Sequence, residues 1–207
     1  TGSEVTKITV LTDTKLHIKL NPSHPNLIPD VVILDAYLTR NAPANITVYT
    51  ALDALAHAIE AFVSTRANQI SDYFAKEAIK LIVNNIQAAY ENPQNLQIRE
   101  QLLLGSFYAG MAFSNASTNL AHATGRALGA KYLLPHGLCV ALMHPFVIEF
   151  TLETCRERYE QIAEVMGLSS AQEIGHFLFS LNNQLGVWKA GEVILDNLTD
   201  EVIDAIT

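Results

Sequence analysis

The feature that most constrains the fold of this chain is a succession of amphipathic helical patterns that follows Asn41-Ala42-Pro43 and continues almost to the C-terminus. Apolar residues recur there every three or four positions, which places them on one face of a helix. Ser71, for example, can cap a helix in which Phe74, Ala78 and Ile82 form one apolar stripe. We expect helices over residues 47–64, from 71 onward, and over 96–113, 118–128, 137–150, 153–166 and 171–185.

The first forty or so residues have a different pattern, which is typical of β-strands. Residues 5–11 are rich in β-branched side chains, and residues 31–34 form a short continuous apolar run of the kind found in buried strands. A loop over residues 21–25 separates the two runs. Because so few strands cannot bury themselves, we expect the last strands of an α/β domain and a chain that is a fragment. The predicted fold is mainly α, with an all-helical domain (42–207, truncated) preceded by a remnant of an α/β domain (1–41).

A carboxylate and an imidazole stand four residues apart at Asp53 and His57. At about 100° per residue they share one helix face, roughly 6 Å apart along the axis. Their sequence neighbours are Ala, Leu and Ile, so Asp53 lies in apolar surroundings where an unpaired carboxylate is costly. A shared metal ion would explain the pair, although the same spacing also occurs as a surface pair on an ordinary amphipathic helix.

Two further histidines stand in apolar, small-residue surroundings. His122 lies in a helix rich in Ala and Gly, and His136 follows Pro135 at a helix start, fourteen residues after His122. An isolated buried histidine is usually a hydrogen-bonded core residue, but here two imidazoles accompany a carboxylate–imidazole pair. One carboxylate and three imidazoles suit Fe²⁺ or Zn²⁺ better than Mg²⁺ or Ca²⁺, which prefer oxygen ligands. The sequence therefore predicts a metal site made by Asp53, His57, His122 and His136.

Several segments of the chain resemble the iron-containing (group III) alcohol dehydrogenase family. Residues 53–60, Asp-Ala-Leu-Ala-His-Ala-Ile-Glu, are similar to the family signature D-A-L-x-H-A-I-E. The stretch from residue 110 through His122 to Leu134-Pro135-His136-Gly137 resembles the longer family signature, including its histidine spacing. Residues 1–6 and 29–35 are similar to the family's segments before the helical domain. The resemblance covers nearly the whole chain and weakens after about residue 170.

The resemblance implies an oxidoreductase that transfers a hydride between NAD(P) and an alcohol or aldehyde. In the family, an N-terminal α/β domain holds the nicotinamide cofactor and a helical domain holds the metal, so this chain corresponds to the C-terminal part. The family's ligands, carried over to this chain, are Asp53, His57, His122 and His136. The metal, Fe²⁺ or Zn²⁺, would act as a Lewis acid on the substrate oxygen, and NAD or NADP would exchange the hydride.

The same resemblance places four residues near the nicotinamide cofactor. Thr1, Gly2 and Ser3 resemble the end of a nucleotide-contacting loop, and Lys19 resembles a lysine that reaches the cofactor. The alternative is an ordinary turn and a solvated lysine. The family's glycine-rich phosphate-binding motif does not occur in this sequence, so the chain alone is expected to bind NAD(P) poorly.

Arg126 follows His122 by four residues, where many family members carry another histidine that is thought to relay protons. Arginine stays protonated at neutral pH and cannot shuttle a proton. It could instead orient an anionic group on the substrate, which would favour a carboxylate- or phosphonate-bearing aldehyde. The alternative is an ion pair between Arg126 and a nearby acid.

Two rival functions remain open at this point. One is a zinc-dependent enzyme similar to glycerol dehydrogenase or dehydroquinate synthase, which have a similar architecture, although the Asp53–His57 and Pro135-His136-Gly137 patterns favour the iron-type branch. The other is an inactive metal-binding or oligomerisation fragment, which the missing phosphate-binding motif leaves open.

Charge and composition narrow the partners. The net charge of −8 and the lack of Lys/Arg runs argue against nucleic-acid binding. We expect no membrane partner, because polar residues interrupt every long apolar segment and no basic-then-apolar leader is present. The two cysteines, Cys139 and Cys155, fit reduced thiols and a cytoplasmic protein. The family resemblance adds a small-molecule alcohol or aldehyde as substrate and a homo-oligomer, most simply a dimer.

Overall fold

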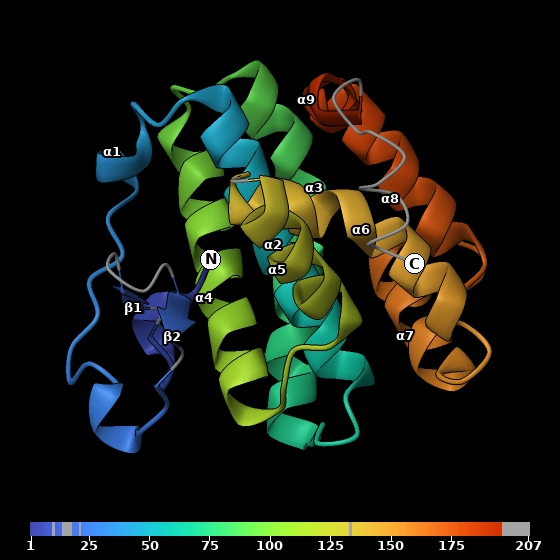
Figure 1. Ribbon diagram of the computed structural model, residues 1–207, viewed down its shortest axis with the longest axis horizontal. Coiled ribbons are helices and arrows are strands. Elements are labelled where there is room, and N and C mark those ends of the chain that lie inside the picture. Colours follow the sequence, from blue (N-terminus) through green and yellow to red (C-terminus); the bar gives the residue numbers. More distant parts are fainter. Residues whose placement is uncertain (10, 14–17, 21, 133, 196–207) are drawn as a thin grey trace.

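The computed structural model describes residues 1–9, 11–13, 18–20, 22–132 and 134–195, without the side chains of 12–13, 18–19 and 192–195. Helices make up most of it, which confirms the predicted helical domain (Figure 1). The described helices, in chain order, are α1 (Ala36–Thr39), α2 (Ala44–Val63), α3 (Gln69–Glu91), α4 (Leu96–Asn115), α5 (Leu120–Tyr132), α6 (His136–Thr151), α7 (Arg156–Met166), α8 (Glu173–Gln184) and α9 (Val187–Leu195).

Helix α2 lies in the middle of the bundle because it is apolar on nearly every side (Figure 1). Val48, Leu55, Ile59 and Phe62 are all fully buried. Helices α3, α4 and α6 pack directly against α2, and α5 contacts it more lightly while packing against α6. Any polar group on α2 is therefore held in a fixed, water-poor environment.

The length and hydropathy of α2 alone would allow it to cross a membrane, contrary to the expectation that polar residues interrupt every long apolar segment. Within the described chain it is the one helix that meets this test, and 83% of its apolar window is buried inside the structure. Burial of this kind is what the core helix of a compact domain requires, so the composition of α2 has a sufficient explanation in packing.

Helix α3 begins one turn earlier than the sequence predicts. Asn68, rather than Ser71, is the N-cap, and its side chain accepts from the backbone N–H of Ile70 and of Ser71. Ser71 accepts in return from the backbone N–H of Asn68, which completes a capping box. The capped start of α3 directly follows the turn that leads out of α2, and α3 packs against α2.

The N-terminal segment contains less sheet than the sequence predicts. Residues 5–11 do not form one strand: the segment opens with the 3-10 helix η1 (Ser3–Val5), and Ile8 pairs with Ser23 in an isolated bridge. Strand β1 (Leu11–Asp13) pairs antiparallel with β2 (Ile18–Leu20), and the 3-10 helix η2 (Pro25–Leu27) follows.

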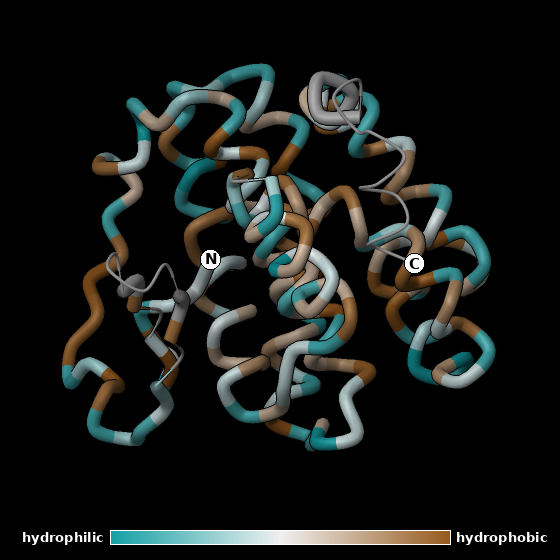
Figure 2. Tube along the Cα trace, viewed as in Figure 1, coloured by the Kyte–Doolittle hydropathy of each residue, from teal (hydrophilic) through white to brown (hydrophobic). Residues whose placement is uncertain are grey.

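The predicted buried strand over residues 31–34 is wrong for the described structure. The segment forms neither strand nor helix in the described chain, and Val31 and Ile33 are 77% and 85% exposed. Figure 2 shows this hydrophobic stretch on the outside of the molecule, away from the helical bundle. Apolar composition favours a buried strand, but a strand forms only where a neighbour supplies hydrogen-bond partners. The proposed boundary between 1–41 and 42–207 stays a prediction, and both η1 and α1 contact α4.

Candidate metal centre

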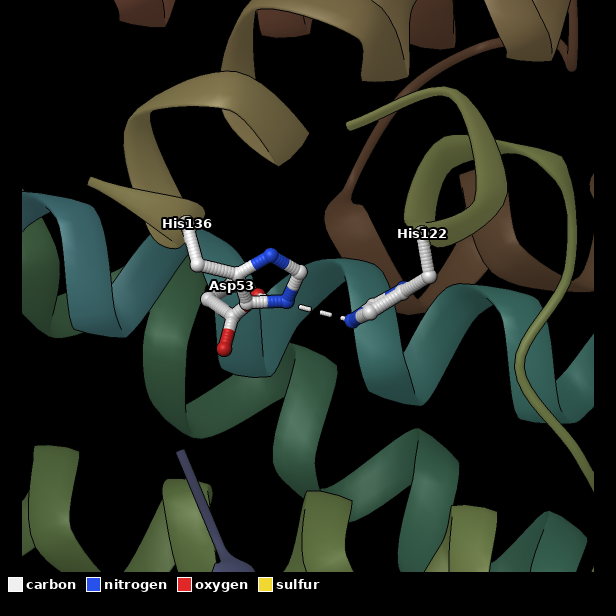
Figure 3. Close-up of side chains that lie close together, drawn as sticks. All are labelled: Asp53, His122 and His136. Carbon is white, nitrogen blue, oxygen red and sulfur yellow. Dashed lines mark ion pairs between the residues drawn. The ribbon is translucent and has the colours of Figure 1, made fainter. Parts of the chain in front are cut away.

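Three helices bring the predicted ligands together. Asp53 and His57 lie in the middle of α2, His122 lies in the first turn of α5, and His136 is the first residue of α6. Figure 3 shows Asp53, His122 and His136 converging from these three helices. Residues that are far apart in the sequence therefore meet at the buried centre of α2.

The distances in this cluster are those of groups that could share one cation. Asp53 Oδ1 lies 3.4 Å from His122 Nε2 and 3.5 Å from His136 Nε2. One ligand atom from each of these three residues lies within 4.8 Å of the other two. Asp53 and His122 are buried, whereas the side chain of His136 is 43% exposed. The cluster thus has a closed side and an open side.

His57 lies beside this group rather than in it. Its Nδ1 is 3.9 Å from Asp53 Oδ2, and its ring stacks between Phe113 and His122 at centroid distances of 4.2 and 4.1 Å. The structure therefore brings together the ligand atoms of three predicted ligands and places the ring of the fourth in contact with them. The role of all four residues as metal ligands stays a prediction.

Three buried polar atoms of the cluster have no hydrogen-bond partner within the described residues. They are Asp53 Oδ1, His57 Nδ1 and His122 Nε2. A buried polar atom without a partner is costly, and native proteins leave few of them. Asp53 Oδ1 and His122 Nε2 lie 3.4 Å apart, and His136 Nε2 lies 3.5 Å from the same oxygen, so the cluster offers a mixed oxygen and nitrogen donor set that suits Fe²⁺ or Zn²⁺. The residues present therefore fit a divalent metal.

The electrostatics of the cluster are dominated by ion pairing. Burial by itself raises the pKa of Asp53, but His122, with smaller contributions from His57 and His136, outweighs it and lowers that pKa to about 2. Burial lowers the pKa of His122, but the carboxylates of Asp53 and Glu60 outweigh it and raise that pKa to about 9. Burial moves the pKa of His57 well below its usual value. Without metal, the two carboxylates thus favour the protonated form of His122.

Glycine residues allow the three helices to approach one another. A Cβ added at Gly137, the second residue of α6, would lie 2.3 Å from the backbone oxygen of Tyr49 in α2. A Cβ at Gly125 of α5 would lie 3.0 Å from Val140 of α6. Because His136 adjoins Gly137, this close contact between α6 and α2 places the imidazole beside Asp53.

Glu60 is a residue of the site to which the sequence analysis gave no role. Its Oε2 lies 2.6 Å from His122 Nδ1, and the side chain is buried. Burial raises the pKa of Glu60, but the hydrogen bond with His122 and further contacts outweigh it, so the net pKa is lowered. The available signal was spacing: Glu60 follows Asp53 by seven residues, which puts both carboxylates on one helix face two turns apart.

The residues predicted near the nicotinamide cofactor have mixed surroundings. Thr1 and Ser3 are exposed, whereas Gly2 is buried with a φ of 74°. A Cβ at Gly2 would lie 2.7 Å from the Cα of Gly110 in α4, so tight packing alone explains a glycine there. Lys19 lies in β2, and its side chain falls outside the described part of the structure. The cofactor roles of these four residues stay predictions.

Arg126 is exposed on α5, one helical turn after His122 and on the same face. Among the described residues, no acidic group lies within ion-pair distance of its guanidinium. The alternative of a pair with a nearby acid therefore finds no support there, and the role in orienting a substrate anion stays a prediction.

Comparison with known proteins agrees with this geometry. Residues 47–190 match the model of the Fe-containing alcohol dehydrogenase family, C-terminal part. The chain is 43% identical over 166 residues to the probable alcohol dehydrogenase EutG of Escherichia coli. The aligned region covers 80% of this chain and 42% of EutG. The chain is also 41% identical over 167 residues to the 1,3-propanediol dehydrogenase of Klebsiella pneumoniae, where the aligned region covers 81% and 43%.

A solved structure extends the match to the whole fold. The sulfoacetaldehyde reductase from Bifidobacterium kashiwanohense, in complex with NAD⁺, superposes with a TM-score of 0.91 at 31% identity, covering 100% of this chain and 54% of that one. The chain thus spans about half the length of the relatives that it matches. The helical domain, the metal-ligand pattern and these matches agree, and the chain belongs to the Fe-containing alcohol dehydrogenase family, as the resemblance of its motifs predicts.

Proposed function

We propose that this chain is the metal-binding part of an NAD(P)-dependent alcohol dehydrogenase that interconverts an alcohol and an aldehyde. The observation that carries the proposal is the convergence of Asp53 Oδ1, His122 Nε2 and His136 Nε2, the first two of which are buried without a hydrogen-bond partner among the described residues. Membership of the family and the named activities of its relatives support the reaction type. The dehydrogenase reaction is proposed for the whole protein, of which this chain supplies the metal-binding part.

In this proposal Asp53, His57, His122 and His136 hold one divalent metal. Bound Fe²⁺ or Zn²⁺ would supply Lewis acidity to the substrate oxygen, while a nicotinamide would give or take the hydride. Asp53 contributes the charge that balances the cation, and its burial within the apolar surroundings of α2 keeps water from the closed side. The half-exposed His136 marks the side from which a small substrate can enter.

Finer properties of the cofactors and assembly belong to the same proposal. Nitrogen ligands favour Fe²⁺ or Zn²⁺, and the choice between them depends on availability as much as on geometry. NAD or NADP would approach the segment that contains Thr1, Gly2, Ser3 and Lys19. We further propose a cytoplasmic homodimer, on family resemblance.

The exposed Arg126 favours a second, narrower substrate class, namely aldehydes that carry an anionic group. It lies one turn after His122 with no acid within ion-pair distance in the described chain, so its charge is available to an anion. A relative of the same fold is named as a sulfoacetaldehyde reductase, and its substrate carries a sulfonate. An arginine can hold such a group through two parallel N–H donors.

The substrate prediction is tested with Arg126→Gln. Reduction of sulfoacetaldehyde should lose about 10- to 100-fold in kcat/KM, as expected for about 1.5–3 kcal/mol from a charged hydrogen bond. Reduction of propionaldehyde, which has no anionic group, should change little. Equal losses on both aldehydes would assign Arg126 to the structure or to the reaction itself.

The reaction is tested on the polypeptide encoded by the complete reading frame. After anaerobic loading with Fe²⁺ or Zn²⁺, the protein should oxidise NADH or NADPH in the presence of an aldehyde panel, and His122→Ala should abolish the activity. A wild-type protein that holds one metal ion per chain but turns over no aldehyde or alcohol would refute the dehydrogenase proposal and favour a metal-binding domain without activity.

A further inference from the structure

Glu60 is a buried carboxylate that sits directly behind a predicted metal ligand. It lies on α2, is 2% exposed, and points toward the start of α5. Its Oε1 accepts from the backbone N–H of Ala121 at 2.6 Å, and its Oε2 accepts from the backbone N–H of Asn119 at 2.8 Å. A buried charge needs such compensation, and these contacts tie the beginning of α5 to α2.

The third contact of Glu60 determines which nitrogen of His122 carries the proton. Both oxygens of Glu60 already accept backbone N–H groups, as expected of an ionised carboxylate, which can only accept hydrogen bonds. Oε2 lies 2.6 Å from His122 Nδ1, which must therefore be the donor in this short contact. A neutral imidazole with its proton on Nδ1 has its lone pair on Nε2, and His122 Nε2 is the buried atom without a partner that lies 3.4 Å from Asp53.

We propose that Glu60 is a positioning residue that fixes His122 in the Nδ1–H tautomer and thereby presents Nε2 to the metal. This inference rests on the proposed metal site and assigns no contact between Glu60 and the metal or the substrate. A carboxylate that accepts from the distal N–H of a ligating histidine orients the ring and increases its basicity. Because the same carboxylate holds Asn119 and Ala121, the ring and the first turn of α5 are fixed together.

Glu60→Gln separates this role from simple helix capping. The amide keeps the shape of the side chain but replaces one acceptor oxygen with a donor. If the NH₂ faces Nδ1, the proton of His122 must move to Nε2, the atom required by the metal. If the NH₂ faces Ala121 instead, the histidine loses its anionic partner and α5 loses an acceptor.

The first experiment compares Co²⁺ binding by the purified wild-type chain, Glu60→Gln and a control, Glu160→Gln, using visible absorption and competition with a chelator. In the control, Glu160 Oε2 also accepts a backbone N–H, that of Ala171, at 3.0 Å, but it lies on α7 and outside the metal cluster. Glu60→Gln should weaken Co²⁺ binding about 10- to 100-fold. Glu160→Gln should bind Co²⁺ like wild type, whatever its effect on thermal stability.

The second experiment needs no folded variant of Glu60. In the Zn²⁺-loaded wild-type chain with ¹⁵N-labelled histidine, long-range ¹⁵N–¹H correlations should show His122 protonated at Nδ1 and metal-bound at Nε2. The signals of His122 would be assigned as those that disappear from the spectrum of His122→Gln.

The outcomes distinguish this inference from the proposed function. Wild-type binding of Co²⁺ combined with unchanged affinity in Glu60→Gln, or with His122 protonated at Nε2, would overturn the positioning role and leave the metal site intact. A wild-type chain that binds neither Co²⁺ nor Zn²⁺ would overturn the metal site and this inference with it.

Discussion

At the scale of single residues, the site consists of a histidine between two carboxylates. His122 lies 3.4 Å from Asp53 Oδ1 through Nε2 and 2.6 Å from Glu60 Oε2 through Nδ1. Both carboxylates are buried, so their charges act at short range through a medium of low polarity. Without metal, this arrangement favours a protonated His122, and a cation that binds at Nε2 replaces that proton.

His144, a buried histidine outside the predicted ligand set, should make the stability of the fold depend on pH. Burial lowers the pKa of His144 to about 4, and its Nε2 has no partner in the described structure. In the unfolded chain His144 binds a proton near pH 6.5, so the unfolded state takes up more protons than the folded state between pH 6.5 and 4. Its contribution to stability is complete above pH 6.5 and is lost as the pH falls toward 4, on the order of 3 kcal/mol in all.

We therefore predict that His144→Asn changes the pH dependence of unfolding. In urea titrations of chelator-treated protein, the slope of unfolding free energy against pH should be smaller than in wild type between pH 6.5 and 4. The largest possible reduction is about 1.4 kcal/mol per pH unit, which corresponds to one proton. His57, Asp53 and Glu60, whose pKa values are also lowered in the folded protein, titrate in both proteins and contribute to the remaining slope. An unchanged slope would mean that His144 is not held in its neutral form by the fold.

At the scale of elements, the site depends on how closely α6 approaches α2. Gly137 contacts the backbone of Tyr49, and a side chain there would require the start of α6 to move. His136 is the neighbouring residue and the only predicted ligand contributed by α6. The position of the His136 imidazole thus depends on Gly137 having no side chain.

Gly137→Ala tests this dependence. We expect it to lower the unfolding free energy by about 1–3 kcal/mol through overpacking and to weaken Co²⁺ binding as His136 is displaced. The control is Gly175→Ala in α8, where the nearest atom to a new Cβ is the Cγ of the exposed Glu149 at 3.2 Å. That flexible side chain can move, so metal affinity should stay at the wild-type level. Wild-type affinity in Gly137→Ala would show that the contact with Tyr49 does not position His136.

The helices were more predictable from the sequence than the N-terminal segment. Regular apolar spacing reports a buried face directly, so α2 and α4 begin within three residues of their expected positions. The run over 31–34 misled because composition cannot tell whether a pairing strand is present, and the segment is exposed. Helix α9 was not predicted. It follows Gly186, whose φ of 73° ends α8, and the expected helical segment stopped at that break.

The site was predictable in its residues but not in its contacts. Asp53 and His57 share a helix face by spacing, and the motifs indicated His122 and His136. Spacing could not show that His57 would stack against Phe113 with its Nδ1 3.9 Å from Asp53. Glu60 was overlooked because a glutamate on a helix is usually solvated, and its burial depends on α5 packing over it.

At the scale of the whole molecule, the site lies where three packed helices meet. Helix α2 packs against α3, α4 and α6, while α5 packs mainly on α6, which also contacts α8 and α9. The proposed ligands come from α2, α5 and α6. A metal bound there would connect the central helix to both of the others, and the free energy of metal binding would add to that of the fold.

Metal removal should therefore reduce the stability of the entire helical bundle. For a metal that binds only the folded state, a free concentration of 100 Kd adds about 2.7 kcal/mol. We expect Zn²⁺ to raise the Tm of the chelator-treated wild-type chain in a concentration-dependent way, measured by circular dichroism. Asp53→Asn should remove most of this response. A Tm that rises equally in wild type and Asp53→Asn would indicate binding elsewhere.

The central claim is that the chain binds one metal ion, and its most direct test is the metal content of the anaerobically purified chain. This content is measured by inductively coupled plasma mass spectrometry after removal of loosely bound ions. The wild-type chain should contain close to one Fe or Zn per molecule, and His122→Ala should contain almost none while keeping its helical circular dichroism spectrum. Full retention of the metal in folded His122→Ala would contradict the assignment of Asp53, His57, His122 and His136 as a metal site.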